Sequence, residues 1–291
     1  MWSIEYLMNS NGSIINHTVK SPERRRSPLP LVILAVLFVV VPFLTWYLTW
    51  FGRPLSDDQI DQYLSDANKP RNVQHALLQI ADRIARGDRT AKRWYPRIVA
   101  MTDHHIAEIR VTAAWAMGHD NTSEEFHNAL LKFLEDPNPM VRRNAALSLV
   151  RFADPKGKPE LTMMLRPYAV RSDRNGTVSI LAREGGPVAQ GTLLARITDS
   201  NGQVFEVRSP FSSRVKSIGA RDGSVVAVGD ELVKLAPEAD QVWEALRALY
   251  LIGQMEDIPD VERYAQGISG MPDRIRQQAT LTAEAIRSRA R

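Results

Sequence analysis

The sequence contains no cysteine. This absence excludes disulfide bonds, thiolate metal sites and thiol nucleophiles. The sequence also has little excess charge, since 37 Lys and Arg residues face 33 Asp and Glu residues, for a net charge of +4. No basic stripe with interleaved aromatic residues is present, so we expect no nucleic-acid partner. The 291 residues, 44% of them hydrophobic, suffice for one large or two modest domains.

Motifs for catalysis are equally scarce. The segment "GISG" (267–270) lacks the spacing of a nucleophile elbow, and no glycine-rich loop ends in Gly-Lys-Ser/Thr. Histidines and acids gather in "DHHIAE" (103–108) and "HDNTSEEFH" (119–127). The first segment is typical of a turn between helices, and the second of a helix start capped by Thr122 or Ser123. We therefore expect no enzyme, no metal and no cofactor.

One long apolar run lies near the N-terminus. Residues 29–51 carry no charge and would form a helix of about 34 Å at roughly 1.5 Å per residue, which predicts a transmembrane helix. Basic residues cluster before the run, which places a disordered tail (1–28) in the cytoplasm and residues 53–291 in the periplasm. A cleavable signal peptide is the alternative, but aromatic rings rather than small residues follow the run. The prediction is a bacterial inner-membrane protein with a single pass that contacts the lipid bilayer through 29–51.

The next segment, 56–166, has apolar residues at intervals of three and four, which is typical of helices. An offset of 32 aligns "EIRVTAAWAMG" (108–118) with "MVRRNAALSLV" (140–150). Pro137 and Pro139 mark a turn before the second copy because proline does not continue a helix. A helix, a proline-containing turn and another helix, repeated at this interval, predict a stacked α-solenoid.

This pattern resembles a known repeat family. "LEDPNPMVRRNAALSLVRFAD" (134–154) resembles a HEAT repeat, with Asp136 and Arg142 where that family usually places its Asp and Arg. "MPDRIRQQATLTAEAIR" (271–287) has the same spacing. The resemblance implies that HEAT-like helices resume over 238–290.

Between these helical parts, residues 168–236 form glycine-punctuated runs typical of strands. "AREGGPVAQGTLL" (182–194) recurs as "ARDGSVVAVGDEL" (220–232), which predicts two halves related by a pseudo-twofold axis. The duplication resembles the biotinyl/lipoyl-like barrel-sandwich hybrid, in particular that of membrane fusion proteins, which are periplasmic adaptors. Carriers of this family attach their cofactor to a lysine on the hairpin between the halves. The hairpin at Asn201-Gly202 has no lysine, so we expect an unmodified domain.

The expected fold class is α+β multidomain: a single transmembrane helix, a HEAT-like α-solenoid and an inserted all-β barrel-sandwich hybrid. The expected function is that of a membrane-anchored envelope scaffold or adaptor, an accessory part of a transport, secretion or other membrane complex. Its partners would be other membrane or envelope proteins. Candidate partner contacts are Asn201, Gly202, Arg142 and Trp94, whereas Trp115 is expected in the core.

Three alternatives remain open at this stage. The chain would be an accessory or carrier-like subunit of an enzyme complex, a sensor of a ligand or metal, or a eukaryotic luminal protein. The last alternative is suggested by glycosylation triplets at Asn121 and Asn175.

Overall fold

The computed structural model describes residues 29–46, 54–66 and 69–291, and the chain divides into two units, 1–54 and 55–291. In the first unit, helix α1 (Leu29–Trp46) has 18 residues and contains Pro42. It has no charged residue, and the apolar side chains described along it are exposed.

The prediction of a transmembrane helix over 29–51 is wrong for the helix that the structure describes. Among the described residues, no helix combines the length and the apolar character that crossing a bilayer requires. Helix α1 ends at Trp46, which gives a length of about 27 Å, against roughly 30 Å for a hydrocarbon core. The predicted end at residue 51 and the predicted tail 1–28 lie outside the described residues. The predicted fold class is therefore corrected to a helical fold with two small antiparallel sheets. The predicted single-pass inner-membrane location is not supported by the described helices.

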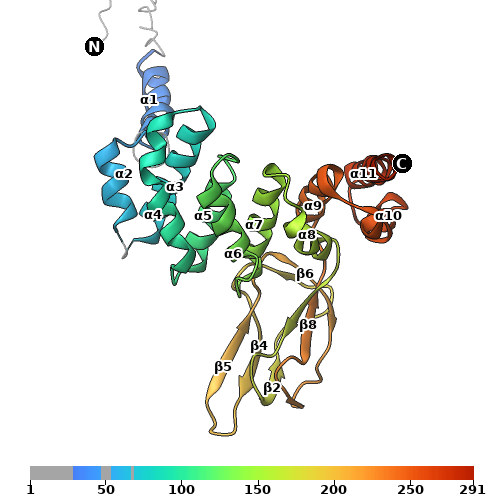
Figure 1. The fold of residues 1–291 in the computed structure, drawn as a ribbon. Helices are drawn as coiled ribbons and strands as arrows, with labels where there is room; N and C mark the ends of the chain where they lie inside the picture. Colours follow the sequence, from blue (N-terminus) through green and yellow to red (C-terminus); the bar gives the residue numbers. More distant parts are fainter. Residues whose placement is uncertain (1–28, 47–53, 67–68) are drawn as a thin grey trace, which may run out of the picture. The chain divides into compact units, whose positions relative to one another are not determined.

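The second unit contains helices that follow one another as antiparallel pairs (Figure 1). The pairs are α2 (Asp57–Leu64) with α3 (Pro70–Ala85), α4 (Tyr95–Ala100) with α5 (Ala107–Met117), α6 (Glu124–Phe133) with α7 (Pro139–Arg151), α8 (Lys158–Met164) with α9 (Ala239–Ile252), and α10 (Ile258–Ala265) with α11 (Asp273–Arg289). Short 3-10 helices precede four of these helices: η2 (Arg89–Trp94), η3 (Met101–Asp103), η4 (Pro155–Gly157) and η5 (Met255–Asp257).

Local sequence sets where these helices begin. Ser56, Ser123 and Asn138 are N-caps whose side-chain oxygens accept bonds from backbone N–H groups of the first turn. Pro139 occupies the first turn of α7, where its missing N–H costs nothing. The turn before α7 therefore ends one helix and starts the next.

The second helices of the pairs contact one another in series, α3 on α5, α5 on α7, α7 on α9 and α9 on α11. We call this row the inner layer. Small residues allow close approach, because a Cβ at Gly118, just after α5, would lie 2.6 Å from Oγ of Ser148 in α7. The Ser148 hydroxyl donates a buried bond to the carbonyl of Ala114, at 2.8 Å. Two hydrophobic cores, with Trp94 and Tyr264 among their largest side chains, fill the N-terminal and C-terminal pairs.

The strands lie between α8 and α9. They are β1 (Tyr168–Arg171), β2 (Gly176–Ile180), β3 (Pro187–Val188), β4 (Leu193–Thr198), β5 (Val204–Arg208), β6 (Ser213–Ile218), β7 (Val225–Val226) and β8 (Glu231–Leu235). They form two four-stranded antiparallel sheets with the orders β1-β8-β6-β3 and β5-β4-β2-β7. We call residues 168–235 the β unit.

The two halves of the β unit form equivalent hydrogen bonds to each other. Gly191 N–H donates to the carbonyl of Ser209, and Gly229 N–H donates to that of Ser172, both at 2.8 Å. Glycine is required at both positions because φ is +79° at Gly191 and +91° at Gly229. Apolar side chains from both halves meet in a third core that includes Val178, Leu194, Val215 and Leu232. The duplicated sequence therefore has a duplicated backbone geometry.

The two ends of the β unit lie side by side, because β1 pairs with β8 and Tyr168 lies opposite Leu235. Helices α8 and α9 can therefore contact each other as a pair even though the β unit separates them in the sequence. Figure 1 shows the β unit extending from the row of helices, with the end of the β4–β5 hairpin farthest from them.

Candidate interaction surfaces

An arginine at the same position of α5 and α7 ties successive helix pairs together. In α5, Arg110 donates from Nε and Nη2 to the Asp136 carboxylate at 2.6 and 2.9 Å, and from Nη1 to the carbonyl of His104 at 2.7 Å. The Asp136 hydrogen bond raises the pKa of Arg110, although burial opposes it. We call this arginine and its equivalents the ladder arginines.

Arg142, a predicted partner contact, is the ladder arginine of α7. Its Nη1 donates to the carbonyl of Asp136 at 2.8 Å, and its Nε donates to Glu160 of α8 at 3.1 Å. The guanidinium is thus occupied within the chain. The sequence placed Asp136 and Arg142 in one motif, but the Asp136 carboxylate bonds Arg110 of the preceding pair.

The adjacent Arg143 lies where the β unit meets the helices. It is buried, and its Cζ lies 4.1 Å from the ring centroid of Phe211 and 5.7 Å from that of Tyr168. Its Nη1 donates to Oε1 of Gln241 in α9, at 2.8 Å. Burial lowers the pKa of Arg143 to about 10. One side chain therefore contacts the β unit at two aromatic rings and the helix that follows it.

Trp115 is exposed on the inner layer, contrary to the expectation that it lies in the core. Its exposed fraction is 38%, and it meets the His119 ring edge-on at a centroid distance of 4.4 Å. The equivalent positions one repeat later are Leu147 and Arg151, which are half-buried and exposed. We call these four residues the Trp115 patch. Large aromatic rings and arginines are the residue types that dominate binding energy in protein interfaces.

Asn201 and Gly202 lie in the exposed loop of the β4–β5 hairpin. Asp199 N–H donates to the carbonyl of Gln203 at 3.0 Å, so this bond closes a loop of three residues. Only Gly202 of that pair has a positive φ, +78°. The Asp199 carboxylate accepts from the N–H groups of Asn201 and Gln203, at 2.8 and 2.9 Å, which stiffens the loop.

Trp94, the remaining predicted contact, is only 1% exposed. Its Nε1 donates to the Asp61 carboxylate of α2 at 2.9 Å, and the guanidiniums of Arg83 and Arg93 lie 5.0 and 5.1 Å from its ring. The ring is therefore not accessible to a partner, contrary to the predicted contact.

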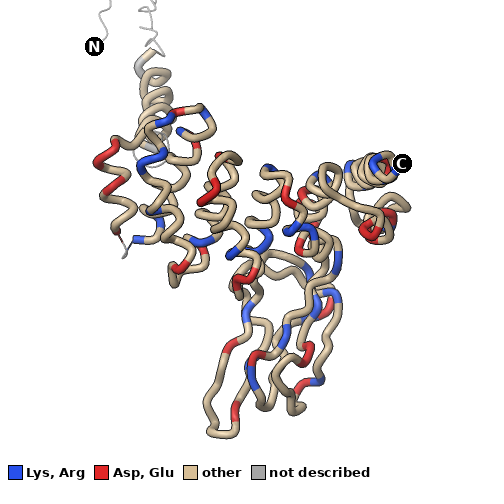
Figure 2. Tube along the Cα trace, in the orientation of Figure 1, with Lys and Arg blue, Asp and Glu red and all other residues tan. Residues whose placement is uncertain are grey.

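The two segments considered for metal binding serve as turns and helix starts. Asp103 pairs with Lys132, His104 accepts the N–H of Ile106, and Asp120 accepts the hydroxyls of Tyr95 and Thr122. Over the described ranges, no three His, Asp or Glu side chains gather as a metal site would require. Figure 2 shows that the positions of Lys and Arg are interspersed with those of Asp and Glu along the helical row.

The helix pairs that carry Arg110 and Arg142 match a known repeat family. Residues 95–174 match the family model for HEAT repeats. The helix pairs in this range are therefore similar to HEAT repeats. The match covers the pairs α4–α5 and α6–α7, α8 and the start of the β unit, and it confirms the HEAT-repeat prediction for this part.

No curated protein matches the chain. Among solved structures, a single-chain, multi-domain long-chain acyl-CoA carboxylase is 22% identical over 45% of this chain. The matched region is 15% of that protein, and the TM-score is 0.23. A similarity at this level carries no argument about fold or function.

Proposed function

We propose that the chain is a scaffold or adaptor whose HEAT repeats and β unit bind other proteins. The observation that carries the proposal is the Trp115 patch, a half-exposed indole on the inner layer with histidine and arginine beside it. An indole buried by a partner removes a large apolar area from water, and the flanking cation adds a charged hydrogen-bond donor. The ladder arginines support this role, because their bonds hold neighbouring repeats in one geometry. This geometry fixes the relative positions of the residues in the Trp115 patch.

For the β unit, we propose that it is an unmodified barrel-sandwich hybrid of the biotinyl/lipoyl-like type. In this proposal its β4–β5 hairpin contacts a partner. The support is the duplicated hydrogen-bond pattern of its halves, the stiff loop at Asp199–Gln203 and the lack of lysine in that loop. The resemblance of the β unit to that of periplasmic adaptors supports this proposal. It suggests that the partner is a multi-subunit protein complex.

Site-specific photo-crosslinking tests the proposal in cells that naturally express the chain. The photo-crosslinking amino acid p-benzoylphenylalanine replaces Trp115 in one variant and Asn201 in another, and mass spectrometry identifies the captured proteins. A third variant carries it at the exposed Glu125 on α6 as a matched control. The proposal expects a defined protein captured from Trp115 or Asn201 and not from Glu125. Equal capture from all three positions, or none from any, contradicts it.

The carrier alternative has a separate measurement. A biotinylated or lipoylated chain would be heavier than its sequence mass, so intact-mass spectrometry of the chain from cells that attach both cofactors decides this question. An unmodified mass would leave the scaffold proposal in place. A shifted mass would replace it with the carrier function.

A further inference from the structure

The ladder has a third arginine at the far end of the helical row. Arg276 in α11 follows Ile275 and precedes Ala279, as Arg110 follows Ile109 and precedes Ala113 in α5. The buried positions of the two helices agree with this alignment, since Ile275 and Ala279 are buried in α11 and Ile109 and Ala113 in α5. Arg276 is therefore a ladder arginine by position.

Its contacts differ from those of the other ladder arginines. Arg110 and Arg142 each reach an acid of the next helix pair. Arg276 donates from Nη2 to Asp273 in the first turn of its own helix, at 3.2 Å, and no other described residue accepts from it. Its side chain is 56% exposed, against 12% for Arg110. An exposed pair of this kind holds the guanidinium only weakly.

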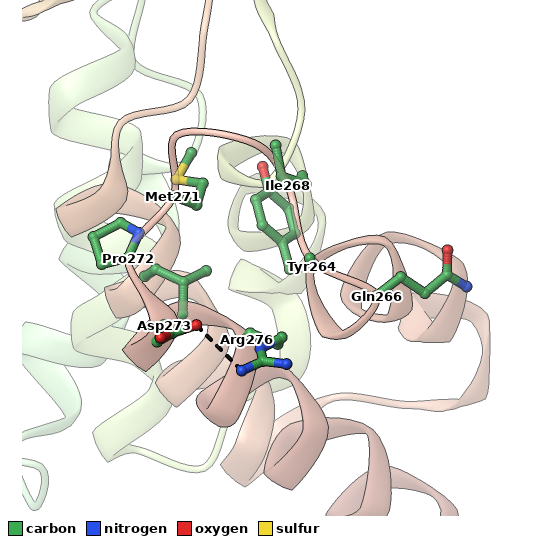
Figure 3. Close-up of a pocket in the computed structure, with 9 residues that line it drawn as sticks. Tyr264, Gln266, Ile268, Met271, Pro272, Asp273 and Arg276 are labelled. Atoms are coloured by element: carbon green, nitrogen blue, oxygen red, sulfur yellow. Dashed lines mark hydrogen bonds and ion pairs between the residues drawn. The ribbon is translucent and has the colours of Figure 1, made fainter.

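A cavity of about 300 Å³ lies beside Arg276. Figure 3 shows Tyr264, Ile268 and Met271 around it, with the Asp273–Arg276 pair at one side. The wall is the turn between α10 and α11. In an earlier pair the corresponding turn contacts the next pair, since Asp103 of η3 bonds Lys132 of α6 while both side chains stay mostly exposed. The cavity thus corresponds to a surface that a following helix pair contacts elsewhere in the row.

We infer that Arg276 and this cavity form a binding site for an Asp or Glu carboxylate on a helical segment of a protein partner. This inference rests on the proposed scaffold function and names the chemistry of one partner surface. The repeat itself supplies the charge complementarity, because both equivalent arginines bind a carboxylate that the next helix pair presents. The apolar wall formed by Ile268 and Met271 takes the apolar side chains of the partner segment, and the guanidinium fixes its register.

The test places p-benzoylphenylalanine at the exposed Gln277, next to Arg276, in the full chain expressed in its own cells. The expected product is a crosslink to an acidic helical segment of a partner, located by mass spectrometry. Arg276→Glu should lower the crosslink yield about tenfold or more, because it sets two carboxylates against each other. Changing the partner's carboxylate to Arg should restore the yield with Arg276→Glu.

The matched control is Arg274→Glu, an exposed arginine of the same helix that pairs with Asp240. It should leave the Gln277 crosslink within about twofold. The inference is overturned if Gln277 captures nothing, captures a segment without an acid, or gives the same yield with Arg276→Glu. Capture from Trp115 or Asn201 without capture from Gln277 would overturn this site alone and leave the scaffold function standing.

Discussion

The ladder pair of Arg110 and Asp136 should be the strongest electrostatic link between repeats. The Asp136 side chain is 6% exposed and accepts two bonds from Arg110 and one from the N–H of Asn138. Arg110→Met leaves a buried carboxylate with one donor, which costs about 3–5 kcal/mol. Asp136→Asn retains the shape but loses the charge, at a cost of about 2 kcal/mol.

A double-mutant cycle measures the interaction itself. We expect a coupling free energy of about 2 kcal/mol between Arg110→Met and Asp136→Asn, from urea unfolding of the full chain followed by circular dichroism. The control cycle uses Arg274→Met and Asp240→Asn, an exposed pair whose coupling should stay below about 1 kcal/mol. A coupling below about 0.5 kcal/mol for the ladder pair, or equal to that of the control, would refute the role assigned to the ladder.

Three further predictions concern stability and use the same urea assay. Gly185 and Gly223 are equivalent turn residues with φ of +73° and +76° and open space at the Cβ position, so each mutation to Ala should cost about 1–2 kcal/mol. Unequal costs would contradict the duplicated geometry. Burial, and then the charge of Arg151, lower the pKa of His119, so the folded state binds fewer protons than the unfolded state. The free energy of unfolding should therefore fall as pH drops below about 6.5, and less steeply in His119→Gln; identical pH profiles would reject this assignment. Trp94→Ala should cost about 3–5 kcal/mol because the ring is buried, whereas Trp115→Ala should cost only about 1 kcal/mol. Similar costs for the two tryptophans would mean that Trp115 is a core residue after all.

The helical repeat was visible in the sequence because the same short spacing of buried residues recurs along the chain. The spacing of Ile109, Arg110 and Ala113 recurs at 141–145, and each helix needs the same buried face against its neighbour. The turns of the β unit lie where glycines interrupt the apolar runs, because the left-handed backbone at Gly185 and Gly223 accepts little else.

The side-chain partners were not visible, because they depend on distances between elements. Trp94 reads as an aromatic among cations, yet Asp61 of another helix accepts its N–H and the ring is buried in the N-terminal core. Trp115 aligns with Leu147 and reads as core, but the inner layer leaves it uncovered. The partner of Asp136 also lies one repeat back, which a motif confined to a single repeat does not reveal. For α1, hydropathy alone did not give the position at which the described helix ends.

The insertion of the β unit between α8 and α9 has a consequence for the order of folding. Most helix pairs of the row close over short turns, such as 134–138, so they form by local contacts. Helices α8 and α9 meet only when residues 165–238 close into a loop, which costs roughly 2 kcal/mol more entropy than a short turn. Pairing of β1 with β8 brings the two ends together, so the contacts within the β unit offset that cost. We therefore expect the β unit to fold before α9, α10 and α11 join the row, and weakening the β1–β8 pair should slow the folding of the C-terminal helices first.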